Sequence, residues 1–181
     1  MRDHPEVLDW LAAADPLRVA YRPATATDLL GYGASSVYAE TFWLPIVGPS
    51  ATFALRRLSA WLEHEPDGIS VSIETLGQCL GVGAGTGRRA PTVRTLGRLV
   101  NFKIASVDGD RYLLRRELPL LSPRQIERLP ACLITAHEQM IQGSTRGVTR
   151  TSLTPAPGVV EALPPEFAAR PGAAPVGSPR R

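Results

Sequence analysis

The chain has 181 residues, of which 44% are hydrophobic, and this is enough for one ordinary domain with additional segments. Its formal net charge of +3 is a mild basic excess, which permits a nucleic-acid partner without requiring one. No segment has the pattern of a signal peptide or of an apolar membrane span, so we expect neither. The two cysteines, Cys79 and Cys132, stand inside apolar helical patterns, which predicts reduced and buried thiols in a cytoplasmic protein.

Residues 1–48 are predicted to form an N-terminal extension that packs on the core. Apolar residues at near-helical spacing predict a short amphipathic helix, and they are Val7, Leu8, Trp10 and Leu11. Turn residues at 22–36 indicate a loop, and Pro45 is expected to break any long helix in the apolar segment after it. Up to residue 49 the chain is acidic, with three arginines against six carboxylates.

Residues 49–117 show a clear order of elements. A helix is predicted to start at Pro49 and to end before Gly68. Its apolar face consists of Ala51, Ala54, Leu55, Leu58, Trp61 and Leu62. Residues 69–73 alternate apolar side chains with serine, as in a short strand, and the Ser72 hydroxyl can cap a second helix. The apolar side of that second helix consists of Ile73, Leu76, Cys79 and Leu80.

A third helix is predicted over Pro91–Asn101, after a glycine-rich loop. Its apolar side consists of Val93, Leu96, Leu99 and Val100. Arg94, Arg98 and Asn101 point the opposite way on a helical wheel. Two strand-like segments then follow, residues 104–107 and 112–114, and the Asp-Gly pair between them is a strong signal for a hairpin turn.

This order of helix, strand, helix, helix and two hairpin strands resembles the winged helix-turn-helix superfamily. More loosely, the chain resembles actinobacterial winged-helix proteins, and its layout is similar to that of the N-terminal domains of phage and plasmid replication initiators. The resemblance implies a mainly α fold with a small β wing, an α+β class. The winged helix-turn-helix core would span residues 49–117, followed by a C-terminal helix over 118–141 and a tail over 142–181.

In winged helix-turn-helix proteins the third helix enters the major groove and the hairpin lies near the DNA backbone. From Arg88 to Lys103 the chain has five basic residues and no acidic one, which suits contact with phosphates. We expect Arg94 and Arg98 to lie in the major groove, with further contacts before the helix and at the hairpin. The complete set of candidate DNA contacts is Arg88, Arg89, Thr92, Arg94, Thr95, Arg98, Asn101, Lys103, Arg111, Arg115 and Arg116.

Enzymatic chemistry is not predicted. Thr86 stands where the third glycine of a G-x-G-x-x-G phosphate loop would follow Gly81 and Gly83. The three histidines are far apart, and Cys132 and His137 fit a core thiol and a surface imidazole better than metal ligands. We therefore expect no catalytic residue, metal or cofactor.

The C-terminal part divides into a helical segment and a tail. Ser122 and Pro123 mark a helix start, and Pro130 is expected to kink or break the helix. The segment either packs back on its own domain or forms a homodimer. Residues 142–181 are dense in proline, glycine and alanine, which predicts a disordered tail.

The function expected from these patterns is binding of double-stranded DNA, in transcription regulation or replication initiation. The alternative is a winged-helix module for protein–protein interaction without DNA binding. Its surface would come from the acidic, aromatic N-terminal segment, through Tyr38, Phe42 and Trp43.

Overall fold

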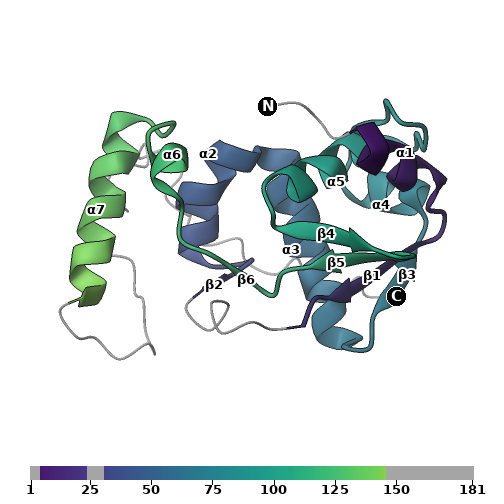
Figure 1. Cartoon of the computed structure of the whole chain (residues 1–181), viewed down its shortest axis with the longest axis horizontal. Coiled ribbons are helices and arrows are strands. Elements are labelled where there is room, and N and C mark those ends of the chain that lie inside the picture. The colour runs from purple at the N-terminus through teal and green to yellow at the C-terminus, as the bar shows by residue number, and fades with distance from the viewer. Residues whose placement is uncertain (1–4, 24–30, 146–181) are drawn as a thin grey trace, which may run out of the picture.

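The fold combines helices with two small sheets, and the computed structural model describes it for residues 5–23 and 31–145. The helices are α1 (Pro5–Ala13), the π-helix η2 (Ala39–Trp43), α2 (Leu44–Val47), α3 (Pro49–His64), α4 (Ile73–Cys79), α5 (Pro91–Asn101), α6 (Pro123–Ile126) and α7 (Ala131–Thr145). The strands are β1 (Leu17–Tyr21), β2 (Tyr32–Gly33), β3 (Ile69–Val71), β4 (Ala105–Asp108), β5 (Arg111–Leu114) and β6 (Glu117–Leu118). The fold is therefore mixed α and β, in agreement with the predicted α+β class. Figure 1 shows the larger sheet at one end of the molecule and α7 at the other.

The larger sheet has the strand order β3-β1-β5-β4, so a strand from the N-terminal segment lies inside it. β1 pairs antiparallel with β3 and parallel with β5. Leu17 and Val19 of β1 are buried while Arg18 between them is exposed, the alternation of a half-buried strand. The sequence prediction missed β1. The N-terminal segment thus supplies an interior strand in addition to packing on the core.

The elements predicted for residues 49–117 are all present. α3 starts at Pro49, as predicted, and α5 spans the predicted residues. The backbone N–H of Thr75 donates to the Ser72 hydroxyl at 3.0 Å, which confirms the predicted cap of α4. β4 and β5 form the predicted antiparallel hairpin, in which Gly109 turns with a φ of 57°. Short-range signals were sufficient for this part of the fold.

α1 crosses α5 at Gly97 and covers one flank of that helix. A Cβ atom on Gly97 would lie 2.5 Å from Leu8 Cδ2, so the glycine is what allows the two helices to approach so closely. Leu8 and Leu11 of α1 are buried at this contact. The side of α5 that stays open to solvent carries Arg94 and Arg98.

The expectation that Pro45 breaks a long helix is wrong. The helical backbone runs from η2 through Pro45 into α2. Proline lacks an N–H, and its ring clashes with the carbonyl four residues before it in a regular α-helix. Here the turn just before Pro45 is widened, because the N–H of Leu44 donates to the carbonyl of Ala39, five residues back. The π-turn thus accommodates the proline without ending the helix.

The aromatic residues proposed as a protein-binding surface are instead part of the core. Tyr38, Phe42 and Trp43 are each no more than 3% exposed. The indole N–H of Trp43 donates to the carbonyl of Pro119 at 3.0 Å, so its polar atom is also used internally. These three side chains therefore cannot anchor a partner. The predicted burial of the cysteines is wrong as well, because Cys79 and Cys132 are both exposed free thiols.

α6 and α7 bear out the predicted start and break of the C-terminal helical segment. Ser122 and Gln125 form a capping box, and the helical segment is interrupted before α7 at Pro130. Several apolar residues of α7 pack against the core, namely Leu133, Ile134, Ala136 and Met140. The segment thus packs on its own domain, which is one of the two expected arrangements, and the homodimer stays a prediction. The tail was predicted over 142–181, but α7 continues to Thr145, so its first four residues are helical, and the rest lies outside the described residues.

His137 on α7 is buried, not on the surface as predicted, with 4% of the residue exposed. Its Nε2 lies 3.0 Å from the hydroxyl of Tyr38, which in turn accepts a hydrogen bond from the N–H of Leu121 at 2.8 Å. Burial raises the pKa of Tyr38 to about 12, so its hydroxyl keeps its proton and can donate it to a neutral imidazole. Burial also lowers the pKa of His137, although the nearby Glu138 carboxylate opposes this shift.

Lowering the pH is expected to weaken the docking of α7. Because the pKa of His137 is lower in the folded chain, the unfolded chain binds the proton more readily. Stability is therefore complete above the ordinary histidine pKa of about 6.5 and falls below it, by at most about 1.4 kcal/mol per pH unit. The free energy of unfolding, measured with urea at a series of pH values between about 8 and about 5, tests this effect.

Two substitutions separate His137 from other titrating groups. His137→Gln should reduce the pH dependence, because glutamine can accept the Tyr38 hydrogen bond without titrating. His64→Gln should leave it in place, because His64 is exposed at the end of α3. An equal pH slope in the wild type and in His137→Gln would contradict this account.

Candidate functional site

The solvent side of α5 presents two arginines on a rigid support. Arg94 and Arg98 lie one turn apart and are both exposed. The opposite side of the helix is fully buried, with Val93, Leu96 and Leu99 each 0% exposed. The hydroxyl of Tyr112 also donates to the carbonyl of Leu96 at 2.9 Å and ties α5 to β5. The sequence pattern of α5 thus fixes which residues face solvent.

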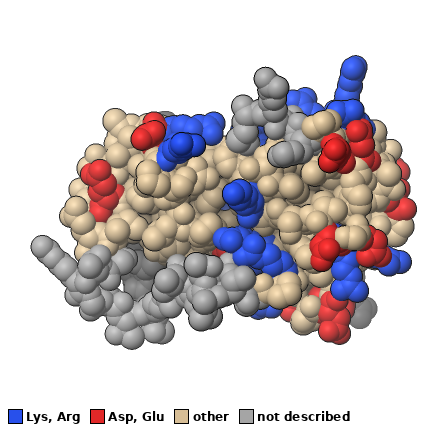
Figure 2. All heavy atoms as spheres, in the orientation of Figure 1, with Lys and Arg blue, Asp and Glu red and all other residues tan. Residues whose placement is uncertain are grey.

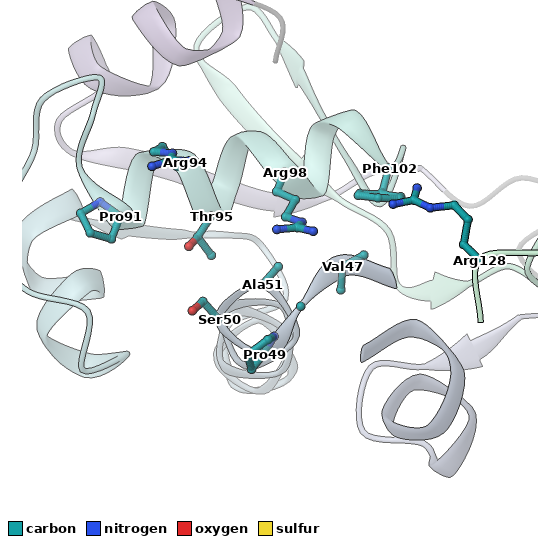
Figure 3. Close-up of a pocket in the computed structure, with 11 residues that line it drawn as sticks. Val47, Pro49, Ser50, Ala51, Pro91, Arg94, Thr95, Arg98, Phe102 and Arg128 are labelled. Atoms are coloured by element: carbon teal, nitrogen blue, oxygen red, sulfur yellow. The ribbon is translucent and has the colours of Figure 1, made fainter. Parts of the chain in front are cut away.

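A cavity of about 450 Å³ lies between this side of α5 and the start of α3 (Figure 3). Thr95 and Arg98 point from α5 toward the first turn of α3, and Arg128 reaches in from the turn after α6. The lining residues are Val47, Gly48, Pro49, Ser50, Ala51, Pro91, Arg94, Thr95, Arg98, Phe102 and Arg128. Segments that are far apart in sequence therefore meet around one basic cavity.

The cavity has no acidic residue in its lining. Within the described part of the chain, Arg94, Arg98 and Arg128 have no carboxylate partner. Some other arginines do have partners. Arg56 pairs with Glu40 at 3.4 Å, and Arg116 lies 4.5 Å from the ring centre of Tyr21. The three cavity arginines are thus positive charges that the fold leaves available for an anion.

Arg88 and Arg89 precede α5 as predicted, but the surroundings of the two arginines differ from each other. The guanidinium of Arg88 lies 3.2 Å from the carboxylate of Asp9 on α1, and both side chains are more than half exposed. Such an exposed pair is screened by salt and is worth little stability, so an anionic ligand can compete for Arg88. Arg89 is exposed next to it.

Two of the predicted contact residues are buried. Thr92 is 0% exposed, because it faces Gly77 of α4 at the contact between the two helices. Thr92 therefore cannot touch DNA, and its prediction is wrong. Thr95 is only 8% exposed, because it faces the start of α3 across the cavity, so it can reach only a group that enters the cavity.

The remaining candidates do not join the cavity. Lys103 is exposed just beyond α5, with a left-handed φ of 60°, and Asn101 is half-buried and already has an interaction partner. On the hairpin and the strand end after it, none of the predicted residues Arg111, Arg115 and Arg116 lines the cavity. Asp110 at the hairpin tip pairs with Arg18 at 2.5 Å. This pair offsets part of the negative charge there.

Sequence reasoning missed Arg128 and the first turn of α3 as parts of the site. Arg128 lies outside the predicted core, and nothing local signals that it turns toward α5.

Figure 2 shows basic side chains across the middle of one face, with acidic and basic side chains intermixed at the end that carries α1 and β3. Basic groups are thus spread unevenly over this face.

Comparison of the chain with protein-family models, curated proteins and solved structures finds no match. The described residues contain no group of three or more His, Cys, Asp or Glu side chains placed to hold a metal ion. Among the helices that the structure describes, none has both the length and the apolar character needed to cross a membrane.

Proposed function

We propose that the protein binds double-stranded DNA through a winged helix-turn-helix arrangement of α3, β3, α4, α5 and the β4–β5 hairpin. In this assignment α5 is the recognition helix and the hairpin is the wing. The insertion of β1 between β3 and β5 extends the sheet and leaves the hairpin at its edge. The proposal includes a role in transcription regulation or replication initiation.

The observation that carries the proposal is the pair of exposed arginines on α5, Arg94 and Arg98, which have no acidic partner among the described residues. Arginine side chains on a rigid helix suit both phosphate oxygens and guanine edges. Arg94 is the better candidate for base contacts, because Arg98 is turned toward the start of α3. Arg89 and Lys103, at the two ends of α5, extend the positive surface.

The test is fluorescence-anisotropy binding of the full chain to a random pool of short labelled duplexes, at several salt concentrations. If α5 and its flanking residues contact about four phosphates, the logarithm of the association constant should fall with the logarithm of salt with a slope of about −3.6. Specific sequences can then be selected from the bound pool. Absence of binding even at low salt would reject the proposal.

A second candidate function is protein binding, favoured by exposed apolar side chains outside the cavity. Phe53 and Val37 are 59% and 51% exposed. Phe53 lines a separate hollow that also includes Trp61 and Leu80. A partner held by such apolar contacts should bind with little dependence on salt, in contrast to DNA. Phe53→Ser should weaken binding of that partner and leave DNA binding unchanged.

A further inference from the structure

We infer that the cavity between α5 and the start of α3 binds a phosphate group, held by Arg98, Arg128 and the first turn of α3. This goes beyond DNA binding, because the group can belong to a small phosphorylated molecule or to a nucleic-acid backbone. The chemistry of recognition is the same for both sources, and phosphate binding and duplex binding by the same variants distinguish them.

The first turn of α3 offers free backbone donors. This helix has 16 residues, and no side chain caps its N-terminus. The first intrahelical bond runs from the N–H of Thr52 to the carbonyl of Gly48 at 3.1 Å. The N–H groups of Ser50 and Ala51 therefore have no partner within the helix, and both residues line the cavity. Free N–H groups and the positive end of the helix dipole together favour an anion.

Arginines complete the positive surroundings from two other parts of the chain. Arg98 lies close to the start of α3, since a Cβ atom on Gly48 would be 3.7 Å from its Nη1. Arg128 comes from the turn after α6, on the other side of Phe102 (Figure 3). With no carboxylate in the lining, these guanidinium groups repel one another across the cavity. A bound phosphate would remove that repulsion and accept hydrogen bonds from both.

Thr95 supplies an independent indication that the cavity suits a polar ligand. The residue is 92% buried, since only 8% of it is exposed, and it points toward the start of α3. Its hydroxyl has no hydrogen-bond partner among the described residues. The Thr95 oxygen is not among the fully buried side-chain atoms without a partner, so it opens onto the cavity and can donate to an oxygen atom bound there. The Ser50 side chain lies on the opposite wall.

The experiment uses the full chain and inorganic phosphate as the probe, with chloride at the same ionic strength as reference. At ten times its Kd, phosphate is expected to raise the Tm by about 3–6 °C relative to chloride. Arg128→Gln should weaken phosphate binding at least about tenfold. Thr95→Val should weaken it severalfold without lowering the Tm measured in chloride, because the hydroxyl has no partner to lose. Arg57 is an exposed arginine outside the cavity, so Arg57→Gln should leave phosphate binding unchanged.

Duplex binding by the same variants identifies the source of the phosphate. If Arg128→Gln also weakens duplex binding about tenfold or more, the cavity takes a backbone phosphate. If duplex binding is unchanged while phosphate binding is lost, the ligand is a small phosphorylated molecule. The inference is overturned if phosphate raises the Tm no more than chloride does. It is also overturned if Arg57→Gln loses as much affinity for phosphate as Arg128→Gln. Phosphate binding by a chain that binds no duplex would reject the DNA proposal alone.

Discussion

Replacing Arg94 and Arg98 together by alanine is expected to lower the affinity for duplex DNA at least about 30-fold at low salt. Each arginine that contacts a base or a phosphate is worth about 1–3 kcal/mol, and the two lie on a single helix face. If both contact phosphates, the salt slope should also become shallower by about 1.8. Fluorescence anisotropy over a salt series measures both quantities. The fold should survive, because neither side chain is buried.

The matched control removes the same charge elsewhere. Arg57→Ala with Arg124→Ala takes two exposed arginines from α3 and α6, outside the cavity lining. This control should retain most of the affinity, with a loss that reflects only the lower net charge. Equal losses in the two double variants would mean that binding depends on overall charge and not on α5. Unchanged affinity of the Arg94/Arg98 variant would remove α5 as the DNA-binding helix.

The second large effect is expected at Gly77, where Gly77→Ala should destabilise the protein by about 2 kcal/mol. A Cβ atom there would clash with the backbone carbonyl oxygen of Gly83 and would lie 2.5 Å from the Thr92 hydroxyl. Overpacking of this kind costs about 3 kcal/mol, whereas alanine gains about 1 kcal/mol of helix propensity over glycine. The clash prevails because a backbone carbonyl cannot turn aside as a side chain can. Thermal unfolding should show a Tm lower by about 4–8 °C.

Gly87→Ala is the control for this prediction. Gly87 lies in the glycine-rich loop that also contains Gly83. No atom lies within 4 Å of the Cβ position of Gly87, and its φ is not left-handed. The substitution should be neutral or stabilise by up to about 1 kcal/mol, because alanine restricts the unfolded chain. A Gly77→Ala variant as stable as the wild type would mean that the loop after α4 is not seated on that helix.

The central elements could be predicted because their signals are local. The proline at the start of α3, the serine cap of α4 and the Asp-Gly turn of the hairpin each act within a few residues. The apolar spacing of α5 likewise determined which side of that helix is buried, and so placed Arg94 and Arg98 on the surface. These residues form their structure largely irrespective of what lies elsewhere in the chain.

Burial of single polar residues was predicted less well, because a helical wheel does not show what packs against each side. Thr92 lies between Leu96 and Leu99 on the wheel of α5 and Thr95 lies at the margin of its polar side, and α4 and the start of α3 cover them. For the same reason Cys132 was predicted to be buried and His137 to be exposed, whereas the structure shows the reverse. Both lie on α7, and the aromatic residues Tyr38 and Phe42 of a distant segment determine which of the two is enclosed.

By itself, the sequence determined the order of the central elements, the faces of α3 and α5 and the local positive charge between Arg88 and Lys103. Only the tertiary structure decided the place of β1 inside the sheet, the pairing of Arg88 with Asp9 and the approach of Arg128 to α5. The physical reason is the range of the interactions. Helix caps, turns and periodicity act over a few residues, whereas strand pairing and cavity formation join segments whose contacts no local pattern encodes.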